Sequence, residues 1–364
     1  MAGIYVHIPF CHSKCAYCDF YSTPHTDRIS SFVQAVIAEW QLRRNELSGS
    51  IGTIYIGGGT PSILATEQLS QIIHALPTDN IQEFTLEANP EDISLEKVKA
   101  WQGLGINRVS MGVQSLDDEC LRKIRRRHNA ASALRAAETL RAAGITNVSL
   151  DAIYGLPGQD LASWEDTLDG LLAYRPEHLS AYALSVEPGT RLYAAIAAGK
   201  TRQADDDTYA AMYEVLCEKT AQAGYEHYEI SNFALPAHRA VHNSHYWDMT
   251  PYIGLGPGAH SWDGHIRRVN PSNLPQYIRD ISSGKTAYEI EDETDRDRIN
   301  DIVFTALRTI DGLDMRCLPG HYRDRLSVMA EHNPGIATDG SRIYIPQDKW
   351  LVSDAIIRDL LFDD

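Results

Sequence analysis

The sequence YVHIPFCHSKCAYC, residues 5–18, brings three cysteines together directly after a predicted strand over Ile4–Ile8. Their spacing is Cys11-x3-Cys15-x2-Cys18, whereas the other three cysteines of the chain stand alone. Thiolates are soft ligands that suit iron–sulfur clusters and zinc. The cysteine cluster therefore predicts a metal centre on the loop that follows the first strand.

The type of metal centre follows from the number of thiolates. Three thiolates on a four-iron cluster leave one iron without a protein ligand, so a small chelating molecule can bind there. Zinc is the alternative, with His7 or His12 as a fourth ligand, but no second Cys or His pair at zinc spacing follows. Unligated structural cysteines are the third alternative. The isolated Cys120, Cys217 and Cys317 are predicted to be small buried apolar residues.

Units of a strand followed by a helix repeat through the first 185 residues. Predicted strands lie at Ile4–Ile8, Thr53–Ile56, Glu83–Glu87, Arg108–Met111, Val148–Ile153 and His178–Leu184. Amphipathic patterns predict helices at residues 28–47, 66–76, 95–104, 117–126, 130–143 and 163–172. Such units form a parallel sheet, either a barrel or an open doubly wound layer, and six are fewer than the eight of a complete barrel. We therefore expect an α/β core domain over residues 1–185.

The pattern changes after about residue 186. Residues 186–285 are predicted to be a connecting region, with ordered loops and short strands over 227–268. Residues 286–364 are predicted to form a smaller α+β domain with a winged-helix-like element, because a helix at 296–310 precedes a hairpin at 335–345 and a helix at 353–361. Winged helices often bind DNA, but residues 289–364 contain 9 Lys and Arg against 17 Asp and Glu, which excludes that function.

Composition limits the partners and the location of the protein. The chain has 364 residues, 43% of them hydrophobic, and a net charge of −16. This charge argues against a nucleic-acid partner, because phosphate binding depends on Lys and Arg. No apolar run approaches the roughly 18–20 residues of a membrane span, and the N-terminus has no signal peptide. We expect a cytoplasmic protein.

Glycines and polar residues stand at the ends of successive predicted strands. The turn Gly57-Gly58-Gly59-Thr60-Pro61 follows the second strand, where glycines let backbone groups approach a ligand closely. Glu87, Gln114 and Asp151 end or follow the next three strands, and Tyr182 lies in the sixth. Each could be a cap or a turn residue. Because the carboxyl ends of parallel strands meet at one edge, we expect these residues to converge near the cysteines.

A basic run at residues 122–127 interrupts the acidic chain. Most of its side chains are expected to lie on a solvated helix face. One that points inward could pair with a ligand carboxylate through two hydrogen bonds, which Arg does better than Lys.

These motifs resemble those of a known family. They are YVHIPFC at 5–11, the cysteine triplet with Tyr17 and Asp19-Phe20, the GGGTP turn at 57–61 and DAIYGLP at 151–157. Together they are similar to the oxygen-independent coproporphyrinogen III oxidase family of radical-SAM (S-adenosylmethionine) proteins, over nearly the whole chain. The chain is most similar to the HemW haem-chaperone group of that family. The oxidase has an extra cysteine where Phe20 stands here, and HemW proteins carry an HNxxYW motif, present as His242–Trp247.

The resemblance implies a fold and a set of site residues. The fold is a partial (β/α)6 barrel. Cys11, Cys15 and Cys18 are implied to ligate a [4Fe–4S] cluster. The residues implied to line the S-adenosylmethionine site are Tyr5, Gly58, Gly59, Thr60, Glu87, Gln114, Arg126 and Asp151.

The first functional hypothesis is a haem chaperone. Such a protein binds haem as cargo and transfers it to acceptor proteins, which could include membrane-associated respiratory proteins. His242 is the predicted haem-binding residue, because imidazole is a common iron ligand, and His245 and His260 are rival ligands. The alternative for His242 is a hydrogen-bonded loop histidine. A homodimer is compatible with the resemblance, although the residues show no interface.

The second hypothesis is an enzyme, the oxygen-independent coproporphyrinogen III oxidase. In that reaction a 5′-deoxyadenosyl radical abstracts hydrogen from a propionate side chain, which is then decarboxylated. The radical-SAM motifs are all present, so the sequence leaves open whether the chain is an enzyme. Phe20 and the HNxxYW motif favour the chaperone.

Overall fold

Six parallel strands form the centre of the protein, whose computed structural model describes residues 1–47 and 49–363. They pair in the order β1 to β6. Their bounds are β1 Ala2–Ile8, β2 Ile51–Gly58, β3 Glu83–Ala88, β4 Arg108–Gln114, β5 Asn147–Tyr154 and β6 His178–Ala183. All six predicted strands are therefore confirmed, each within a few residues, as is the partial barrel.

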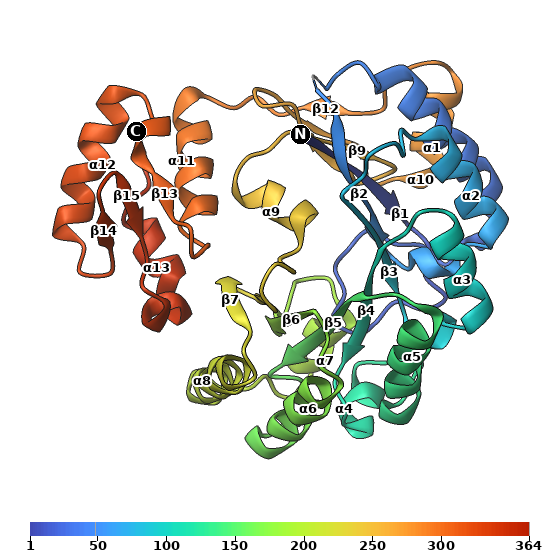
Figure 1. Cartoon of the computed structure of the whole chain (residues 1–364), viewed down its shortest axis with the longest axis horizontal. Helices are drawn as coiled ribbons and strands as arrows, with labels where there is room; N and C mark the ends of the chain where they lie inside the picture. The colour runs from blue at the N-terminus through green and yellow to red at the C-terminus, as the bar shows by residue number, and fades with distance from the viewer. Residues whose placement is uncertain (48, 364) are drawn as a thin grey trace.

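Helices cover the outer face of this sheet (Figure 1). They are α1 Ile29–Arg43, α2 Thr66–Ala75, α3 Leu95–Gly103, α5 Ala130–Ala143, α6 Leu161–Tyr174 and α8 Asp206–Gln222. The short helices α4 Asp118–Lys123 and α7 Arg191–Ala197 instead pack with the cysteine loop in a second apolar cluster. Side chains alternate along each strand, so Ile4, Val6 and Ile8 of β1 face this helical layer and join the main hydrophobic core. The polar residues between them face the barrel interior, which is where a ligand site can form.

Residues 226–290 extend the same sheet at both edges. The full order is β12-β11-β10-β9-β1-β2-β3-β4-β5-β6-β8-β7. The added strands are β7 Glu226–Glu229, β8 Asn232–Ala234, β9 Tyr252–Leu255, β10 His260–Trp262, β11 Arg267–Val269 and β12 Glu289–Ile290. The predicted connecting region is thus hydrogen-bonded to the barrel strands β1 and β6, and the division of the chain at residues 185 and 285 stays a prediction.

Helix α9, Val241–Trp247, connects strand β8 beside β6 to strand β9 beside β1. The expectation of loops and short strands over 227–268 was wrong here, because the sequence VHNSHYW has a low intrinsic helix propensity. The carboxylate of Glu83 in β3 compensates by accepting hydrogen bonds from the backbone N–H of Val241 at 2.8 Å and of His242 at 2.9 Å. This cap comes from a distant strand and leaves no local signal.

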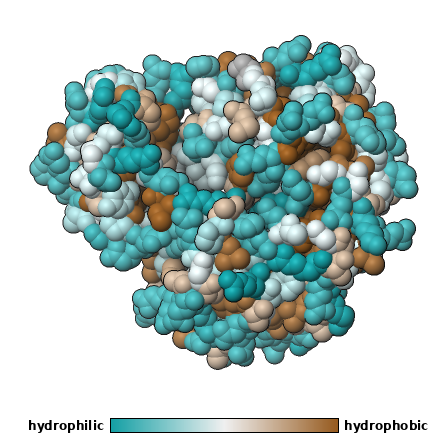
Figure 2. Space-filling view, in the orientation of Figure 1, coloured by the Kyte–Doolittle hydropathy of each residue, from teal (hydrophilic) through white to brown (hydrophobic). Residues whose placement is uncertain are grey.

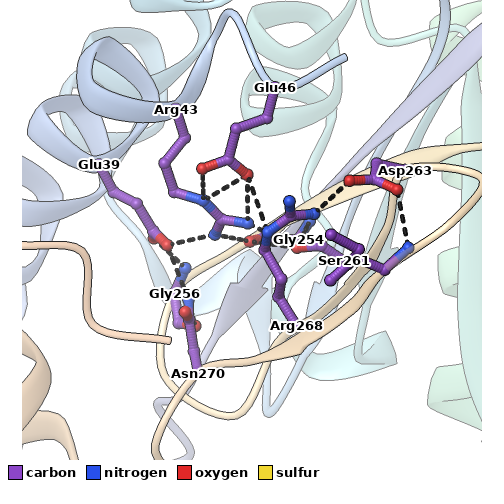
Figure 3. A network of polar contacts seen from close by, with 10 residues as sticks. Glu39, Arg43, Glu46, Gly254, Gly256, Ser261, Asp263, Arg268 and Asn270 are labelled. Atoms are coloured by element: carbon purple, nitrogen blue, oxygen red, sulfur yellow. Dashed lines mark hydrogen bonds and ion pairs between the residues drawn. The ribbon is translucent and has the colours of Figure 1, made fainter. Parts of the chain in front are cut away.

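A buried polar network joins α1 to the added strands (Figure 3). The Arg43 guanidinium donates to Glu39 at 2.7 Å, to the carbonyl of Gly254 at 2.9 Å and to Ser261 at 2.9 Å. Besides the bond from Arg43, the Glu39 carboxylate accepts hydrogen bonds from the Gly256 N–H, from Asn270 and from Tyr277. A carboxylate buried with this many donors fixes β9 and the chain after it against the barrel.

The C-terminal unit lies beside the barrel next to β7 and α9 (Figure 1). Its three-stranded sheet has the order β13-β15-β14, with β13 Leu313–Asp314, β14 Ala337–Asp339 and β15 Arg342–Tyr344. Its helices are α11 Asp295–Ala306, α12 Gly320–His332 and α13 Ser353–Arg358, and α10 Leu274–Ser282 precedes it. The predicted hairpin at Asp339-Gly340 and the smaller C-terminal domain are confirmed, whereas α10 and α12 were not predicted.

Surface features agree in part with expectation. Hydrophilic residues cover most of the face in Figure 2, with hydrophobic ones in small patches. None of the described helices has both the length and the apolar run needed to cross a bilayer.

Cys120 is buried as predicted, but Cys317 is exposed, so the expectation of a buried residue was wrong there. Local sequence does not separate it from a core position.

We expect Arg43→Met to destabilise the protein by about 3–5 kcal/mol, because it leaves the Glu39 carboxylate buried without a cation. The neighbouring Arg44 is exposed, so Arg44→Met is the matched control and should change stability by less than about 0.5 kcal/mol. Urea unfolding measures both. Equal stability of the two variants would show that the network contributes little.

Candidate functional site

The cysteine loop lies at the carboxyl end of β1. Cys11 is buried, Cys15 and Cys18 are half-buried, and all three thiols are free. Burial raises the pKa of Cys18 to about 11, and that of Cys11 is also raised. Among the described residues, no three Cys, His, Asp or Glu side chains are placed to hold a single ion. A cluster, in which each thiolate binds a different iron, does not need that placement.

The glycine turn after β2 packs directly against this loop. The Thr60 hydroxyl donates to the Cys11 sulfur at 3.4 Å. A Cβ on Gly59 would lie 2.7 Å from the Phe10 carbonyl oxygen and 3.0 Å from the Cys11 sulfur. Gly58 has a φ of +111°, which favours glycine. Gly59 is therefore required by the close approach of the two loops, and Gly58 by its own backbone conformation.

Arg126 is the inward-pointing residue of the basic run. Arg122, Lys123, Arg125 and Arg127 are exposed, whereas Arg126 is half-buried. Its guanidinium lies 3.6 Å from the Cys15 sulfur and donates to Asn89 at 2.7 Å and to the Gly112 carbonyl. A small cavity of about 20 Å³ lies between Cys15, Thr60, Asn89 and Arg126. This places a fixed positive charge beside the cysteine loop.

The other predicted polar residues lie at the same end of the barrel. Glu87 accepts hydrogen bonds from the Tyr55 hydroxyl at 2.7 Å and from the Gly58 N–H at 3.0 Å. Asp151 accepts one from the Ser110 hydroxyl at 3.0 Å. Gln114 is buried at the end of β4 with a φ of +68°, a strained value of the kind found at ligand sites.

Burial brings the pKa values of the Glu87 and Asp151 carboxyl groups close to neutral pH. It raises the pKa of Glu87 to about 7 and that of Asp151 to about 6. Ionised carboxylates held in this way accept hydrogen bonds from hydroxyl or ammonium groups of a ligand, and a cationic ligand stabilises their charge.

A cavity of about 360 Å³ lies inside the barrel, between Glu87 and α9. Tyr5 lines it, and the Tyr5 hydroxyl is 3.0 Å from Nδ1 of His7. The complete lining is Tyr5, Tyr55, Glu87, Tyr182, Glu229, Ile230, Ser231, Asn232, Asn243, Tyr246 and Trp247. Glu87 therefore belongs both to the carboxyl edge of the barrel and to its interior.

His242 is fully buried on α9 and hydrogen-bonded through both ring nitrogens. Nδ1 lies 2.8 Å from the Thr53 hydroxyl and Nε2 lies 3.0 Å from the Tyr246 hydroxyl. Burial lowers the pKa of His242 to about 3, so its ring is neutral. An iron ligand role would require one of these bonds to break, and it stays a prediction. Of the rival histidines, His245 is buried and His260 is exposed.

The structure adds residues that the sequence did not single out. Tyr55 joins Glu87 to α9, Asn89 joins Thr60 to Arg126, and Ser110 supports Asp151. The Asn89 amide donates to the Thr60 hydroxyl at 3.3 Å. Asn89 had a usable signal, since it follows β3 directly and precedes Pro90. Tyr55 had none, because an aromatic residue within an apolar strand is typical of core.

Comparison with known proteins agrees with this geometry. Residues 5–171 match the Radical SAM superfamily. The fold is similar to that of coproporphyrinogen III oxidase (HemN) from Escherichia coli, with a TM-score of 0.83 over 99% of this chain and 90% of that chain, at 23% identity. The barrel and its cysteine loop, within residues 5–171, therefore form a radical-SAM domain.

More similar sequences give the particular family. Heme chaperone HemW of Bacillus subtilis is 35% identical over 98% of this chain and 98% of its own length. Heme chaperone HemW of Lactococcus lactis is 36% identical over 85% of this chain and 82% of its own length. The chain belongs to the HemW family, which confirms the resemblance seen in the sequence.

We expect Glu87→Gln to raise the free energy of unfolding, relative to wild type, more at pH 8 than at pH 5. The reason is that wild-type Glu87 loses its proton in the folded state only near pH 7. The raised pKa makes the wild type less stable as the pH rises from about 5 to 7. The variant has no carboxyl group at this position and does not lose stability in this way. Its free energy of unfolding relative to wild type should therefore differ between pH 8 and pH 5 by on the order of 1–3 kcal/mol.

Urea unfolding at both pH values measures the effect. The exposed Glu331 of α12 provides the control, since Glu331→Gln should show the same difference from wild type at both. A Glu87→Gln variant that is relatively less stable at pH 8 would contradict the raised pKa.

Proposed function

We propose that this chain is a radical-SAM haem chaperone, which binds haem and transfers it to acceptor proteins. The observation that carries the proposal is the contact of Thr60 with Cys11 and of Arg126 with Cys15, in a member of the HemW family. These contacts bring a cysteine triplet, a glycine turn and a fixed cation to one edge of the barrel. The proposed location is the cytoplasm.

Cys11, Cys15 and Cys18 would hold a [4Fe–4S] cluster. Three soft thiolates on one loop fit such a cluster, and Arg126 places a positive charge beside Cys15. When bound, the cluster supplies one-electron chemistry at the iron that the protein leaves without a thiolate. A small cavity lined by Cys15, Thr60 and Arg126 lies next to the loop that would hold the cluster.

S-adenosylmethionine would lie along the edge next to this cluster. Arg126 would bind its carboxylate, since a guanidinium donates two parallel hydrogen bonds to that group. Glu87 and Asp151 would accept hydrogen bonds from its amino group or ribose hydroxyls. The residues proposed to line the site are Tyr5, Gly58, Gly59, Thr60, Glu87, Gln114, Arg126 and Asp151.

Haem would bind at α9, with His242 as its ligand and Trp247 and Tyr246 against the macrocycle. Because His242 is buried and doubly hydrogen-bonded, binding would require α9 to move from the barrel. Membrane-associated respiratory proteins as acceptors and a homodimer are further parts of this proposal.

The interior cavity favours the chaperone over the oxidase. Among the described residues that line it there is no Lys, Arg or His, whereas Glu87 and Glu229 both contribute carboxyl groups. Burial raises the pKa of Glu229 to about 7. A propionate carboxylate would enter this cavity without a cation to pair with, which is costly. Phe20, which stands where the oxidase has a cysteine, supports the same choice.

Anaerobically reconstituted protein should bind haem saturably, and His242→Gln should weaken this at least about tenfold, or about 1.4 kcal/mol. His265→Gln, at an exposed loop histidine, is the control and should bind haem as the wild type does. Binding of S-adenosylmethionine by His242→Gln reports whether its fold is intact. In parallel, coproporphyrinogen III with S-adenosylmethionine and a reductant should give no protoporphyrinogen. Turnover, or absence of saturable haem binding, would contradict the proposal.

A further inference from the structure

Tyr55 of β2 contacts both the edge of the barrel and α9. Its ring stacks on the His242 imidazole, with the centroids 5.3 Å apart and the planes at 30°. Its hydroxyl donates to one oxygen of Glu87 at 2.7 Å. The other oxygen of Glu87 accepts from the Gly58 N–H at 3.0 Å. A continuous series of contacts therefore runs from the glycine turn to α9.

Helix α9 lies against α11 and Tyr252 of β9, and three side chains of the barrel strands also hold it. Glu83 caps its first two N–H groups, and the Thr53 hydroxyl lies 2.8 Å from Nδ1 of His242. Tyr55 supplies the third contact, by stacking. Of these three residues Tyr55 is the one that is also bonded to Glu87, so it connects α9 to the proposed S-adenosylmethionine site.

The strength of the hydrogen bond from Tyr55 to Glu87 depends on whether the Glu87 carboxyl group is ionised. The Tyr55 side chain is buried. Burial, and to a smaller extent the negative charge of Glu87, raises the pKa of Tyr55, so its hydroxyl keeps its proton and stays a donor. A ligand that carries an ammonium or sulfonium group stabilises the ionised form of Glu87. Hydrogen bonds to an ionised carboxylate are shorter and stronger than those to a neutral carboxyl group. The Tyr55 ring, and the imidazole stacked on it, are then held more firmly.

We propose that Tyr55 is a positioning residue that transmits occupancy of the S-adenosylmethionine site to α9. When the site is occupied, Glu87 holds Tyr55, and Tyr55 holds α9 against the barrel. When it is empty, α9 is released more easily and His242 becomes accessible. The inference rests on the S-adenosylmethionine part of the proposed function and does not depend on haem.

Amide hydrogen exchange of residues 241–247 tests this coupling directly. In the anaerobically reconstituted full chain, saturating S-adenosylmethionine should slow exchange in α9 at least about fivefold, because opening of the helix becomes less favourable. Tyr55→Phe keeps the stacked ring and removes the hydroxyl. Its α9 should show less than about twofold protection at saturating ligand, with binding verified by equilibrium dialysis.

Tyr225→Phe is the matched control. The Tyr225 hydroxyl donates to the Pro176 carbonyl at 2.5 Å, away from both sites, so this variant loses a buried hydrogen bond but should keep the wild-type protection. Two results would overturn the role of Tyr55 and leave the proposed function standing. One is wild-type protection of the α9 amides in Tyr55→Phe, and the other is no protection in the wild type although S-adenosylmethionine binds. If S-adenosylmethionine did not bind at all, the proposed site would fail as well.

Discussion

The parallel pairing of β1 with β2 is the constraint on which the site depends. Its register sets His7 beside Gly57 and Ile8 beside Gly58. Both strands therefore end at the same edge, and the cysteine loop that follows one must pack on the glycine turn that follows the other. Only glycine fits at position 59, because a side chain would collide with the Phe10 carbonyl. The fold thus determines the sequence of this turn.

The barrel interior is polar, which is unusual for a folded core and must be compensated. Arg108, Glu83 and His178 are buried there, and each faces partners on neighbouring elements. Burial of carboxyl groups such as Glu87 costs stability near neutral pH, and a ligand with complementary charge recovers it. The interior is therefore adapted to a bound molecule, while α9, held by Glu83, Thr53 and Tyr55, forms one wall of its cavity.

Much of the barrel could be predicted because its strands and helices show strong local patterns. The predicted strand at Arg108–Met111 extends to Gln114 in the structure, a typical boundary difference. Arg126 could be predicted only as one of several basic residues, since which of them turns inward depends on Gly112 and Asn89. Helix α9 could not be predicted, because its cap is supplied by a strand 158 residues away.

The iron, acid-labile sulfide and zinc content of oxygen-free preparations tests the central claim most directly. We expect about four iron and four sulfide ions per chain, the content of one [4Fe–4S] cluster, and their loss when Cys11, Cys15 and Cys18 are all replaced by alanine. Replacement of the exposed Cys317 should leave the content unchanged. One zinc ion per chain without sulfide would contradict the account.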